Sequence, residues 1–284
     1  MNLVLGTAQF GQIYGVTNNS KNHDNKKELD EILSLFLDKG FNKLDTAQSY
    51  GNSEKMLGLI GVDEFHITSK IKFPENLSEN KNRVIESIER SLENLRIDSL
   101  DCLLAHNSNF LKTNKNEAID LINSLKKKNL IKQFGVSVYE PSDLIDTSLL
   151  EVIQFPCNIF DQRFINLNNM NDGKIIWQCR SIFLQGILLE PLNRLPIYFK
   201  RYLNTLKDFH TNFPSLNERL SGCINFIMQQ QFQEFLVGVS CTNDLKDIFS
   251  AMEKFKENSS NHNNFNEMSS ELIELIDPRL WRTN

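Results

Sequence analysis

Four side chains of different chemistry follow three successive apolar segments of the chain. Asp45 ends the segment 41–46, and Tyr50 comes five residues after it in sequence. Lys70 ends the segment 65–70, and His106 ends the segment 100–106. If these segments are neighbouring parallel strands, their carboxyl ends lie on one rim, as in barrel enzymes. An acid, a phenol, an ammonium and an imidazole would then meet there.

Such a group is suited to protonating a carbonyl oxygen. A tyrosine with its ordinary pKa of about 10 donates a proton poorly near neutral pH. We expect a charged Lys70 to lower the pKa of Tyr50, and Asp45 to keep Lys70 charged and oriented. His106 can donate a hydrogen bond to an oxygen on which negative charge develops. The four residues therefore predict general acid catalysis by Tyr50.

Each of the four also has a purely structural interpretation. An Asp after a strand commonly caps a helix, and a Lys can extend from a barrel into solvent. A Tyr in a loop often only packs, and a single His is often a satisfied core residue. Their occurrence at consecutive strand ends favours the functional interpretation. We expect Asp45 and Lys70 to pair, because burying either charge alone is costly.

The segments that carry these residues belong to an alternation of short apolar and longer amphipathic stretches. Strict alternation of strands and helices predicts a parallel sheet. Eight such units favour a closed (β/α)8 barrel over an open doubly wound sheet, and we expect residues 1–284 to form one domain of this kind. The opening GTAQFG lacks the GxGxxG of a dinucleotide-binding Rossmann domain. The expected strands are 3–6, 41–46, 65–70, 100–106, 131–138, 151–158, 180–186 and 235–240. The principal expected helices are 28–39, 78–95, 115–128, one around Trp177, 198–210, 215–230 and 243–255, with a further helix at 267–275.

Composition excludes several other classes of protein. The net charge of −5 without a basic patch argues against nucleic-acid binding. No apolar run approaches the roughly 18 residues of a membrane span, and the first residues do not form a secretory signal. The five cysteines are scattered without a CxxC pair, so neither disulfides nor a metal site is expected, and a reducing, cytoplasmic setting fits best. The sequence does not indicate an oligomeric state.

The segment LDTAQSYGNSEKMLG, residues 44–58, is similar to a motif of the aldo-keto reductase family. In that motif four residues separate an Asp from a Tyr, and a Gly and a Glu follow. TSKIK and LLAHNSN supply the Lys and the His of the family, and segments 135–141, 153–163 and 180–189 are similar to its strands 5, 6 and 7. The resemblance implies a (β/α)8 barrel with NAD(P)H-dependent oxidoreductase activity. It also implies that Asp45, Tyr50, Lys70 and His106 are catalytic, with Tyr50 as the proton donor.

The resemblance further implies where a nicotinamide coenzyme would lie. Ser137 and Gln154 would hold the carboxamide, and Phe183 would lie against the nicotinamide ring. Leu184, Gln185 and Gly186 would follow the pyrophosphate. The remaining expected contacts are Gly6, Thr7 and Gln9 on the floor near the nicotinamide, and Gly238, Val239, Ser240 and Thr242 at the adenosine end.

Two positions depart from the family pattern. Val138 stands where the family usually has an Asn, so one carboxamide contact is lost or replaced. Asp244 falls near the position of an Arg that grips the 2′-phosphate of NADPH, and Lys246 is the only basic residue nearby. A carboxylate there would repel a phosphate. The resemblance implies NADP(H), and NAD(H) stays an alternative.

Other functions fit the same residues less well. A Schiff-base aldolase using Lys70 is disfavoured, because Asp45 should keep that lysine protonated. A metal hydrolase using His106 and Asp45 lacks a paired-His motif. A barrel that binds coenzyme as a regulatory or interaction subunit remains the alternative to a reductase. The expected partner is a small carbonyl or alcohol. Segments 6–18 and 180–189 are similar to bacterial family members of surface-polysaccharide pathways, which suggests a sugar-derived carbonyl.

Overall fold

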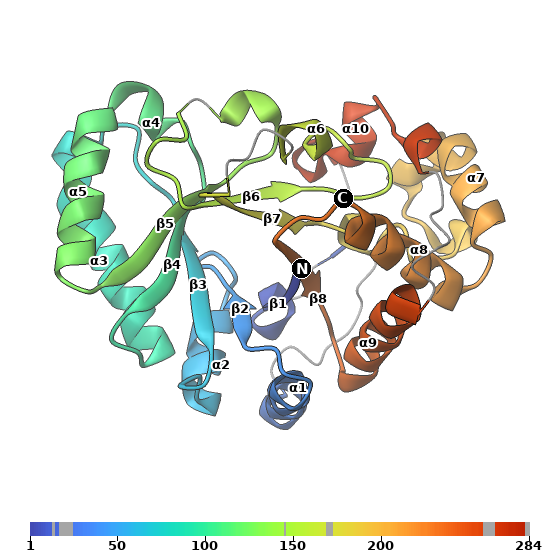
Figure 1. Cartoon of the computed structure of the whole chain (residues 1–284), viewed down its shortest axis with the longest axis horizontal. Coiled ribbons are helices and arrows are strands. Elements are labelled where there is room, and N and C mark those ends of the chain that lie inside the picture. Colours follow the sequence, from blue (N-terminus) through green and yellow to red (C-terminus); the bar gives the residue numbers. More distant parts are fainter. Residues whose placement is uncertain (13–14, 17–24, 145, 169–172, 258–264, 282–284) are drawn as a thin grey trace.

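The strands form a closed parallel barrel in sequence order (Figure 1). The structure, a computed structural model, describes residues 1–12, 15–16, 25–144, 146–168, 173–257 and 265–281. Within them the barrel is built from β1 (Asn2–Gly6), β2 (Lys43–Asp45), β3 (His66–Ile71), β4 (Leu100–Ala105), β5 (Ile131–Ser137), β6 (Val152–Pro156), β7 (Ile176–Arg180) and β8 (Glu234–Gly238). β1 pairs with both β2 and β8, which closes the sheet. The expected (β/α)8 barrel is confirmed.

The strand register brings the carboxyl ends of the strands to one rim. Gly6 pairs with Asp45 on one side and with Gly238 on the other. Further round the barrel, Ser137 pairs with Gln154, and Pro156 pairs with Arg180. Side chains that end different strands are therefore adjacent in space although they are far apart in sequence.

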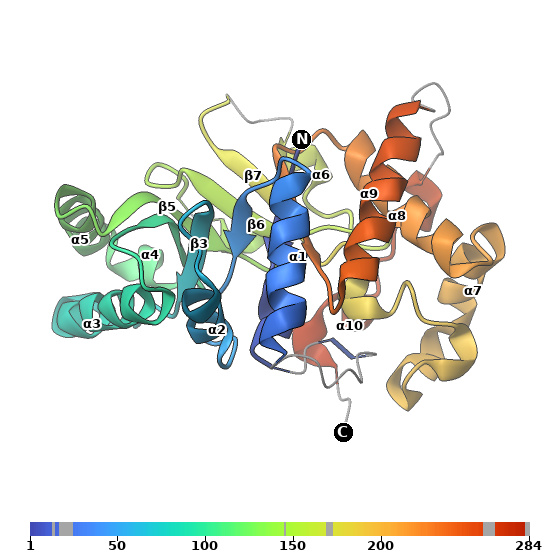
Figure 2. The same cartoon turned by 90° about the horizontal axis from the view of Figure 1, so that it is seen from below.

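Helices surround the barrel, as two perpendicular views show (Figures 1 and 2). Side-chain caps begin several of them: Asn25, Asn76 and Ser215 each accept a hydrogen bond from the backbone N–H three residues later. The helices are α1 (Lys26–Asp38), α2 (Ser53–Ile60), α3 (Leu77–Leu95), α4 (Phe110–Thr113), α5 (Lys115–Lys127), α6 (Ile165–Asn168), α7 (Leu203–Asn212), α8 (Leu216–Gln229), α9 (Thr242–Glu257) and α10 (Ile273–Ile276).

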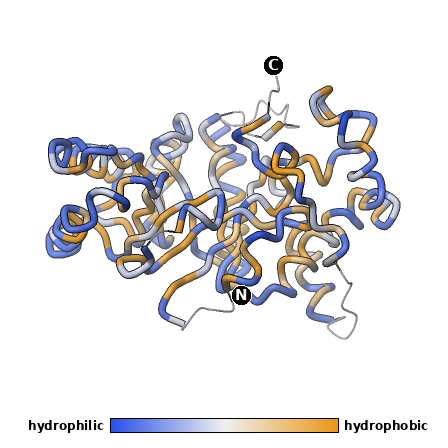
Figure 3. The backbone as a smooth tube through the Cα atoms, turned by 90° about the horizontal axis from the view of Figure 1, so that it is seen from above, coloured by the Kyte–Doolittle hydropathy of each residue, from blue (hydrophilic) through white to orange (hydrophobic). Residues whose placement is uncertain are grey.

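Apolar faces hold these helices against the barrel. On α1 the buried residues Leu29, Ile32, Leu33 and Phe36 follow the helical repeat. α1 and α9 lie side by side (Figure 2). Between them Phe36 of α1 stacks on Phe249 of α9, with ring centroids 6.5 Å apart. Hydrophilic segments gather on the outer turns of the peripheral helices (Figure 3). Among the described residues, no helix combines the length and the apolar character needed to cross a bilayer.

The seventh strand is the main correction to the sequence analysis. The expected helix around Trp177 is instead β7, and the expected strand 180–186 is mostly a turn with a short 3-10 helix at Leu184–Gly186. Ser181, Leu184 and Gln185 have positive φ angles of 61°, 47° and 51°, which a strand cannot accommodate. Trp177 points outward from the barrel, where its ring meets Phe155 edge-on at 5.5 Å.

Two other expected helices are divided. The segment expected as helix 198–210 is a 3-10 helix at Ile197–Tyr202 followed by α7. The expected helix 267–275 consists of a 3-10 turn at Asn266–Met268 and the short α10. Tyr198 links these regions, because its hydroxyl donates to the Glu274 carbonyl at 2.9 Å.

Candidate active site

Asp45 and Lys70 form a buried ion pair at the ends of β2 and β3. Their side chains are 2% and 1% exposed, and the Lys70 ammonium donates to Asp45 Oδ2. Lys70 Nζ also donates to the Thr46 carbonyl at 3.0 Å. The expected pairing of these two charges is confirmed, and the pair compensates the cost of taking both out of water.

A chain of buried hydrogen bonds continues from this pair through the barrel interior. Gln154 Nε2 donates to Asp45 Oδ1 at 2.7 Å and to Gln178 Oε1 at 2.6 Å. Gln178 Nε2 in turn donates to Glu234 Oε2 at 2.7 Å, and Glu234 pairs with Lys43. Because each amide is held at both ends, the chain fixes the orientation of Gln154 beside Asp45. Neither Gln178 nor Glu234 was predicted from the sequence, because Gln178 was assigned to a helix and Glu234 came just before the expected strand 235–240.

Tyr50 and His106 complete the group. The ring centroid of Tyr50 lies 5.0 Å from Lys70 Nζ, and the Tyr50 and His106 rings meet edge-on with centroids 6.3 Å apart. The Ser49 hydroxyl lies 3.5 Å from His106 Nδ1. The structure therefore brings the four sequence-predicted residues together at the rim.

Close backbone packing positions the loop that carries Tyr50. The Asn52 N–H donates to the Gly11 carbonyl at 3.2 Å. A Cβ at Gly11 would lie 2.1 Å from the Ser53 nitrogen, so only glycine fits there. Thr7 Oγ1 lies 2.8 Å from Ser53 Oγ, which in turn donates to the Thr7 carbonyl at 2.8 Å. Thr7 thus stabilises this loop, and it does not line the cavity described below.

The titration of Tyr50 differs from the expectation. Burial is the main cause that raises the pKa of Tyr50 well above its ordinary value, the negative charge of Asp45 raises it further, and Arg180 opposes both. The expected lowering of this pKa is wrong, and Tyr50 keeps its proton at neutral pH. Burial, followed by the charges of Lys70 and Arg180, lowers the pKa of His106 to about 4. His106 is therefore a neutral imidazole with one N–H to donate.

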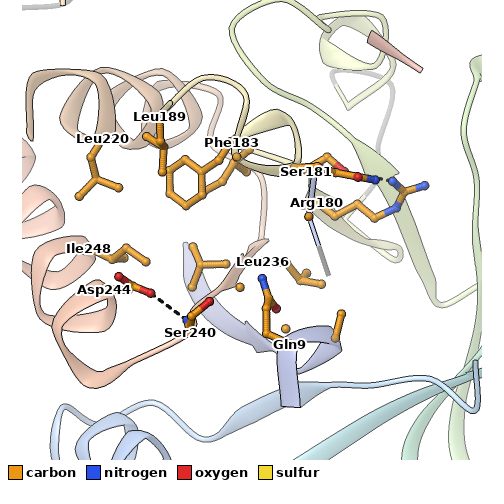
Figure 4. A pocket seen from close by; sticks show the side chains of 18 of the residues that line it. Gln9, Arg180, Ser181, Phe183, Leu189, Leu220, Leu236, Ser240, Asp244 and Ile248 are labelled. Carbon is orange, nitrogen blue, oxygen red and sulfur yellow. Dashed lines mark hydrogen bonds between the residues drawn. The ribbon is translucent and has the colours of Figure 1, made fainter. Parts of the chain in front are cut away.

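An elongated cavity of about 580 Å³ adjoins this group. Figure 4 shows other parts of its lining. Asp45, Tyr50 and Arg180 line it, and so do Asp244 and Asp247. Arg180, whose charge acts on Tyr50, lies at the opposite end of the cavity from Asp244 in Figure 4. The sequence-predicted coenzyme residues that line it are Gly6, Gln9, Gln154, Phe183, Gln185, Gly186, Gly238 and Ser240. The volume is typical of small-molecule sites, and glycines at several lining positions leave room for a ligand close to the backbone.

The other predicted coenzyme residues do not line this cavity. Leu184 and Val239 are buried in the apolar core. Ser137 is buried as well, and its hydroxyl donates to Gln154 Oε1 at 3.3 Å, so it acts on the cavity through Gln154. The Thr242 N–H donates to Glu28 Oε1 at 2.8 Å. Sequence position alone places these residues near the site but does not say which way their side chains point.

Three lining arginines were not predicted. Arg219 is buried, and its guanidinium donates to the carbonyls of Leu189, Phe213 and Pro214. Arg194 is exposed at the cavity edge. Arg180 ends β7, where a correct assignment of that strand would have identified it as a residue of the rim.

The far end of the cavity is acidic. Asp244 Oδ2 accepts the N–H groups of Ser240 and Cys241 at 2.8 and 3.3 Å (Figure 4). Glu28 accepts the first N–H of α9, from Thr242. The N-terminus of a helix commonly offers its free backbone N–H groups to a phosphate. At the start of α9 these N–H groups are instead bound by the protein's own carboxylates.

The comparisons with known proteins agree with this architecture. Residues 2–188 match the model of the aldo/keto reductase family. The chain is 24% identical to D-arabinose 1-dehydrogenase of Saccharomyces cerevisiae over 99% of this chain and 90% of that protein. It is 37% identical to methylglyoxal reductase DkgB of Escherichia coli O157:H7 over 36% of this chain and 39% of that protein.

Among solved structures, the aldo-keto reductase AKR11C1 from Bacillus halodurans in its holo form has the same fold. The TM-score is 0.73 at 19% identity, with 95% of this chain and 92% of that chain covered. The family match spans the strands that carry Asp45, Tyr50, Lys70 and His106 as well as β5, β6 and β7. The chain therefore belongs to the aldo/keto reductase family and is an NAD(P)H-dependent oxidoreductase.

Proposed function

We propose that the protein reduces an aldehyde or ketone, with Tyr50 as the general acid and with Lys70, Asp45 and His106 assisting it. The observation that carries this proposal is the buried Asp45–Lys70 pair beside Tyr50 at the end of an elongated cavity. A nicotinamide coenzyme held by the residues that line this cavity would supply the hydride. The proton that balances it comes from the protein.

Each of the four residues has a distinct part in that proton transfer. Tyr50 retains its proton in the free protein and gives it to the carbonyl oxygen, because a developing alkoxide is a stronger base than a phenolate. Lys70 stabilises the negative charge that remains on Tyr50, and Asp45 holds Lys70 in place. The neutral His106 donates a hydrogen bond to the same oxygen.

Gln154 is the best-placed residue to recognise the carboxamide of the coenzyme. Its amide nitrogen donates to Asp45 and Gln178, so its orientation is fixed and Oε1 is the atom available as an acceptor. Ser137 supports that oxygen. Phe183, Gln185 and Gly186 line the middle of the cavity, and Arg194 is the exposed cation there that suits the pyrophosphate.

The charges at the far end favour NAD(H), whereas the family resemblance alone implies NADP(H). Asp244 and Asp247 line the cavity there, and a carboxylate accepts a hydrogen bond from a ribose hydroxyl but repels a 2′-phosphate. Fluorescence titration of the protein with NADH and NADPH measures the preference. We expect NADH to bind at least about tenfold more tightly, and equal or tighter binding of NADPH contradicts this assignment.

We propose a sugar-derived or other hydroxylated carbonyl as substrate. The similarity to D-arabinose 1-dehydrogenase along nearly the whole chain supports this class. The pairing of β1 with β8 supports a single domain. The five free cysteines support a reducing compartment, and we propose the cytoplasm.

The test is oxidation of NADH and NADPH in the presence of sugar aldehydes, simple aldehydes and ketones. We expect Tyr50→Phe to lower kcat by about 10²–10⁴-fold, the usual contribution of a general acid, while coenzyme binding stays within about twofold. Tyr198→Phe is the matched control, because it removes a hydroxyl that bonds to Glu274 far from this group. Undiminished activity of Tyr50→Phe contradicts the mechanism. A protein that binds coenzyme but reduces no carbonyl would instead be a regulatory subunit.

A further inference from the structure

Arg180 lies over the barrel interior at the reacting end of the cavity. It ends β7 two residues after Gln178, whose side chain bonds to Gln154 and Glu234 inside the barrel. Because alternate residues of a strand face the same side, Arg180 also points to the interior side, at the rim. It lines the cavity together with Tyr50. In Figure 4 it lies at the opposite end of the cavity from Asp244.

The contacts of Arg180 are with neutral groups. Nη1 donates to Ser181 Oγ at 3.2 Å, and Nη2 donates to the Val138 carbonyl at 2.9 Å. The guanidinium carbon lies 4.4 Å from the ring centroid of Tyr139. These two hydrogen bonds use one hydrogen on each terminal nitrogen, and a guanidinium carries five N–H donors. Donors thus remain for a ligand that approaches from the cavity.

Two neighbouring arginines differ from Arg180 in having carboxylate partners. Arg163, which also donates to the Tyr139 carbonyl, binds both oxygens of Asp161 at 2.8 Å. Arg279, whose guanidinium carbon lies 4.3 Å from the Tyr139 ring centroid, pairs with Asp277 at 2.5 Å and lies 3.6 Å from Glu140. Within the part of the chain that the structure describes, no carboxylate lies within ion-pair distance of Arg180.

The reacting end of the cavity therefore has a positive charge that the described residues do not balance. Asp45 is already compensated by Lys70, and His106 is neutral because its pKa is lowered. Arg180 acts on this group electrostatically, since its charge lowers the pKa of both Tyr50 and His106. A guanidinium with unused donors beside a substrate site is suited to a planar carboxylate or a phosphate.

We propose that Arg180 binds an anionic group of the carbonyl substrate, so that the preferred substrates are aldehydes or ketones that carry a carboxylate or a phosphate. This inference rests on the proposed reductase function and narrows its substrate class. It makes Arg180 the residue that determines specificity, while Tyr50 protonates the carbonyl oxygen at the other end of the same substrate.

The test compares kcat/KM for aldehydes that differ in charge. 4-Carboxybenzaldehyde is paired with benzaldehyde, and glyceraldehyde 3-phosphate with glyceraldehyde, so the two pairs distinguish a carboxylate from a phosphate. We expect the charged member of at least one pair to be preferred at least about tenfold. Arg180→Gln should lower kcat/KM for that member by about 10–100-fold, the effect of losing a charge-assisted hydrogen bond. The ratio of kcat/KM for the charged and the neutral member should fall at least about tenfold.

Control variants separate the loss of charge from the loss of fold. Arg180→Lys keeps the charge and should retain most of the preference for the anion. Arg90→Gln removes an exposed charge on α3, outside the lining of the cavity, and should leave the preference unchanged. Absence of any preference in the wild-type protein overturns the proposal. An equal loss for charged and neutral substrates in Arg180→Gln also overturns it, because Arg180 would then act on the reaction itself.

A binding measurement keeps this proposal separate from the reductase function. Terephthalate resembles 4-carboxybenzaldehyde but cannot be reduced, and its binding to the protein with coenzyme present is measured by calorimetry. We expect Arg180→Gln to weaken that binding at least about tenfold, and an unchanged affinity overturns the anion site. If terephthalate binds through Arg180 but no carbonyl is reduced, the proposed function fails and the anion site stands.

Discussion

The two ends of the cavity are built in different ways. At the reacting end the polar groups come from strands, and Asp45, Lys70 and Gln154 are each no more than 2% exposed. At the far end Ser240 and Asp244 belong to the loop after β8 and the first turn of α9. There the side chain of Asp244 holds backbone N–H groups near the surface.

This difference determines what a substitution can do at each end. Buried strand residues share hydrogen bonds with one another, so a change in one leaves another buried polar group without its partner. A carboxylate near the surface interacts with a ligand through a higher effective dielectric and can be exchanged at a smaller cost. We therefore expect variants at the reacting end to lose both catalysis and stability, and variants at the far end to change only coenzyme choice.

The largest effect is expected for Lys70→Met. It leaves the Asp45 carboxylate buried without its cation, and breaking a buried pair in this way costs about 3–5 kcal/mol. It also removes the charge beside Tyr50, so kcat should fall by at least about 10³-fold. Urea unfolding and steady-state kinetics measure the two losses.

Two further variants separate the loss of stability from the loss of catalysis. Lys70→Met combined with Asp45→Asn removes both charges and should recover part of the stability while staying inactive. Lys43→Met removes the lysine at the other end of the polar chain, where the side chain is 35% exposed. It should lower kcat by less than about tenfold. A Lys70→Met protein that keeps wild-type kcat contradicts the comparison between the two ends.

An intermediate effect is expected from pH. The pKa of His106 is lowered from its ordinary 6.5 to about 4 by burial and by Lys70 and Arg180. Between these values the unfolded chain binds a proton at this residue and the folded protein does not, so the free energy of unfolding decreases as pH falls from about 6.5 to about 4. The full contribution of this change in pKa is about 3 kcal/mol.

The His106→Asn variant measures that contribution. As pH falls over the same range, the free energy of unfolding of this variant should decline less steeply than that of the wild type. Urea titrations at several pH values measure both slopes. The pKa of His210 is also lowered to about 4, by burial and by Arg219, so the wild type and the variant should share the decline that His210 causes. Identical slopes for the two proteins contradict the lowered pKa of His106.

The strands of the barrel also differ in how well they could be predicted from the sequence. Strands β2, β3 and β4 lie within segments that the sequence predicted as strands. Each ends at or next to a residue with evident chemistry, so Asp45, Lys70 and His106 were correctly expected at strand ends. β7 was displaced along the chain, because the apolar residues Ile182, Phe183 and Leu184 look like a strand. In the folded protein they lie in a turn in which Ser181, Leu184 and Gln185 have positive φ angles. Local pattern does not reveal that kind of strain.

The polar chain inside the barrel could not be predicted from sequence for a related reason. Gln178 and Glu234 are side chains that ordinarily lie on the surface. They are buried here because the strand register places each one next to a partner, Gln154 and Lys43 among them. The predicted lowering of the Tyr50 pKa was wrong because burial outweighs the nearby positive charge. The extent of that burial depends on the whole fold, which the local sequence does not show.

The smallest effect is expected at the far end, for Asp244→Asn. An Asn keeps an oxygen that can accept the N–H groups of Ser240 and Cys241, so the loop should keep its shape and the free energy of unfolding should change by less than about 1 kcal/mol. Removal of the charge should favour NADPH over NADH by about 3–10-fold in the ratio of their dissociation constants. Fluorescence titration at low ionic strength measures this ratio. The kcat with saturating NADH should stay within about twofold, because Asp244 lies at the opposite end of the cavity from Arg180, whose charge acts on Tyr50. Asp30→Asn, on the exposed face of α1, is the matched loss of one negative charge and should leave the ratio unchanged. A kcat that falls together with the change in ratio would mean that the two ends of the cavity are coupled, and the separation argued above would then be wrong.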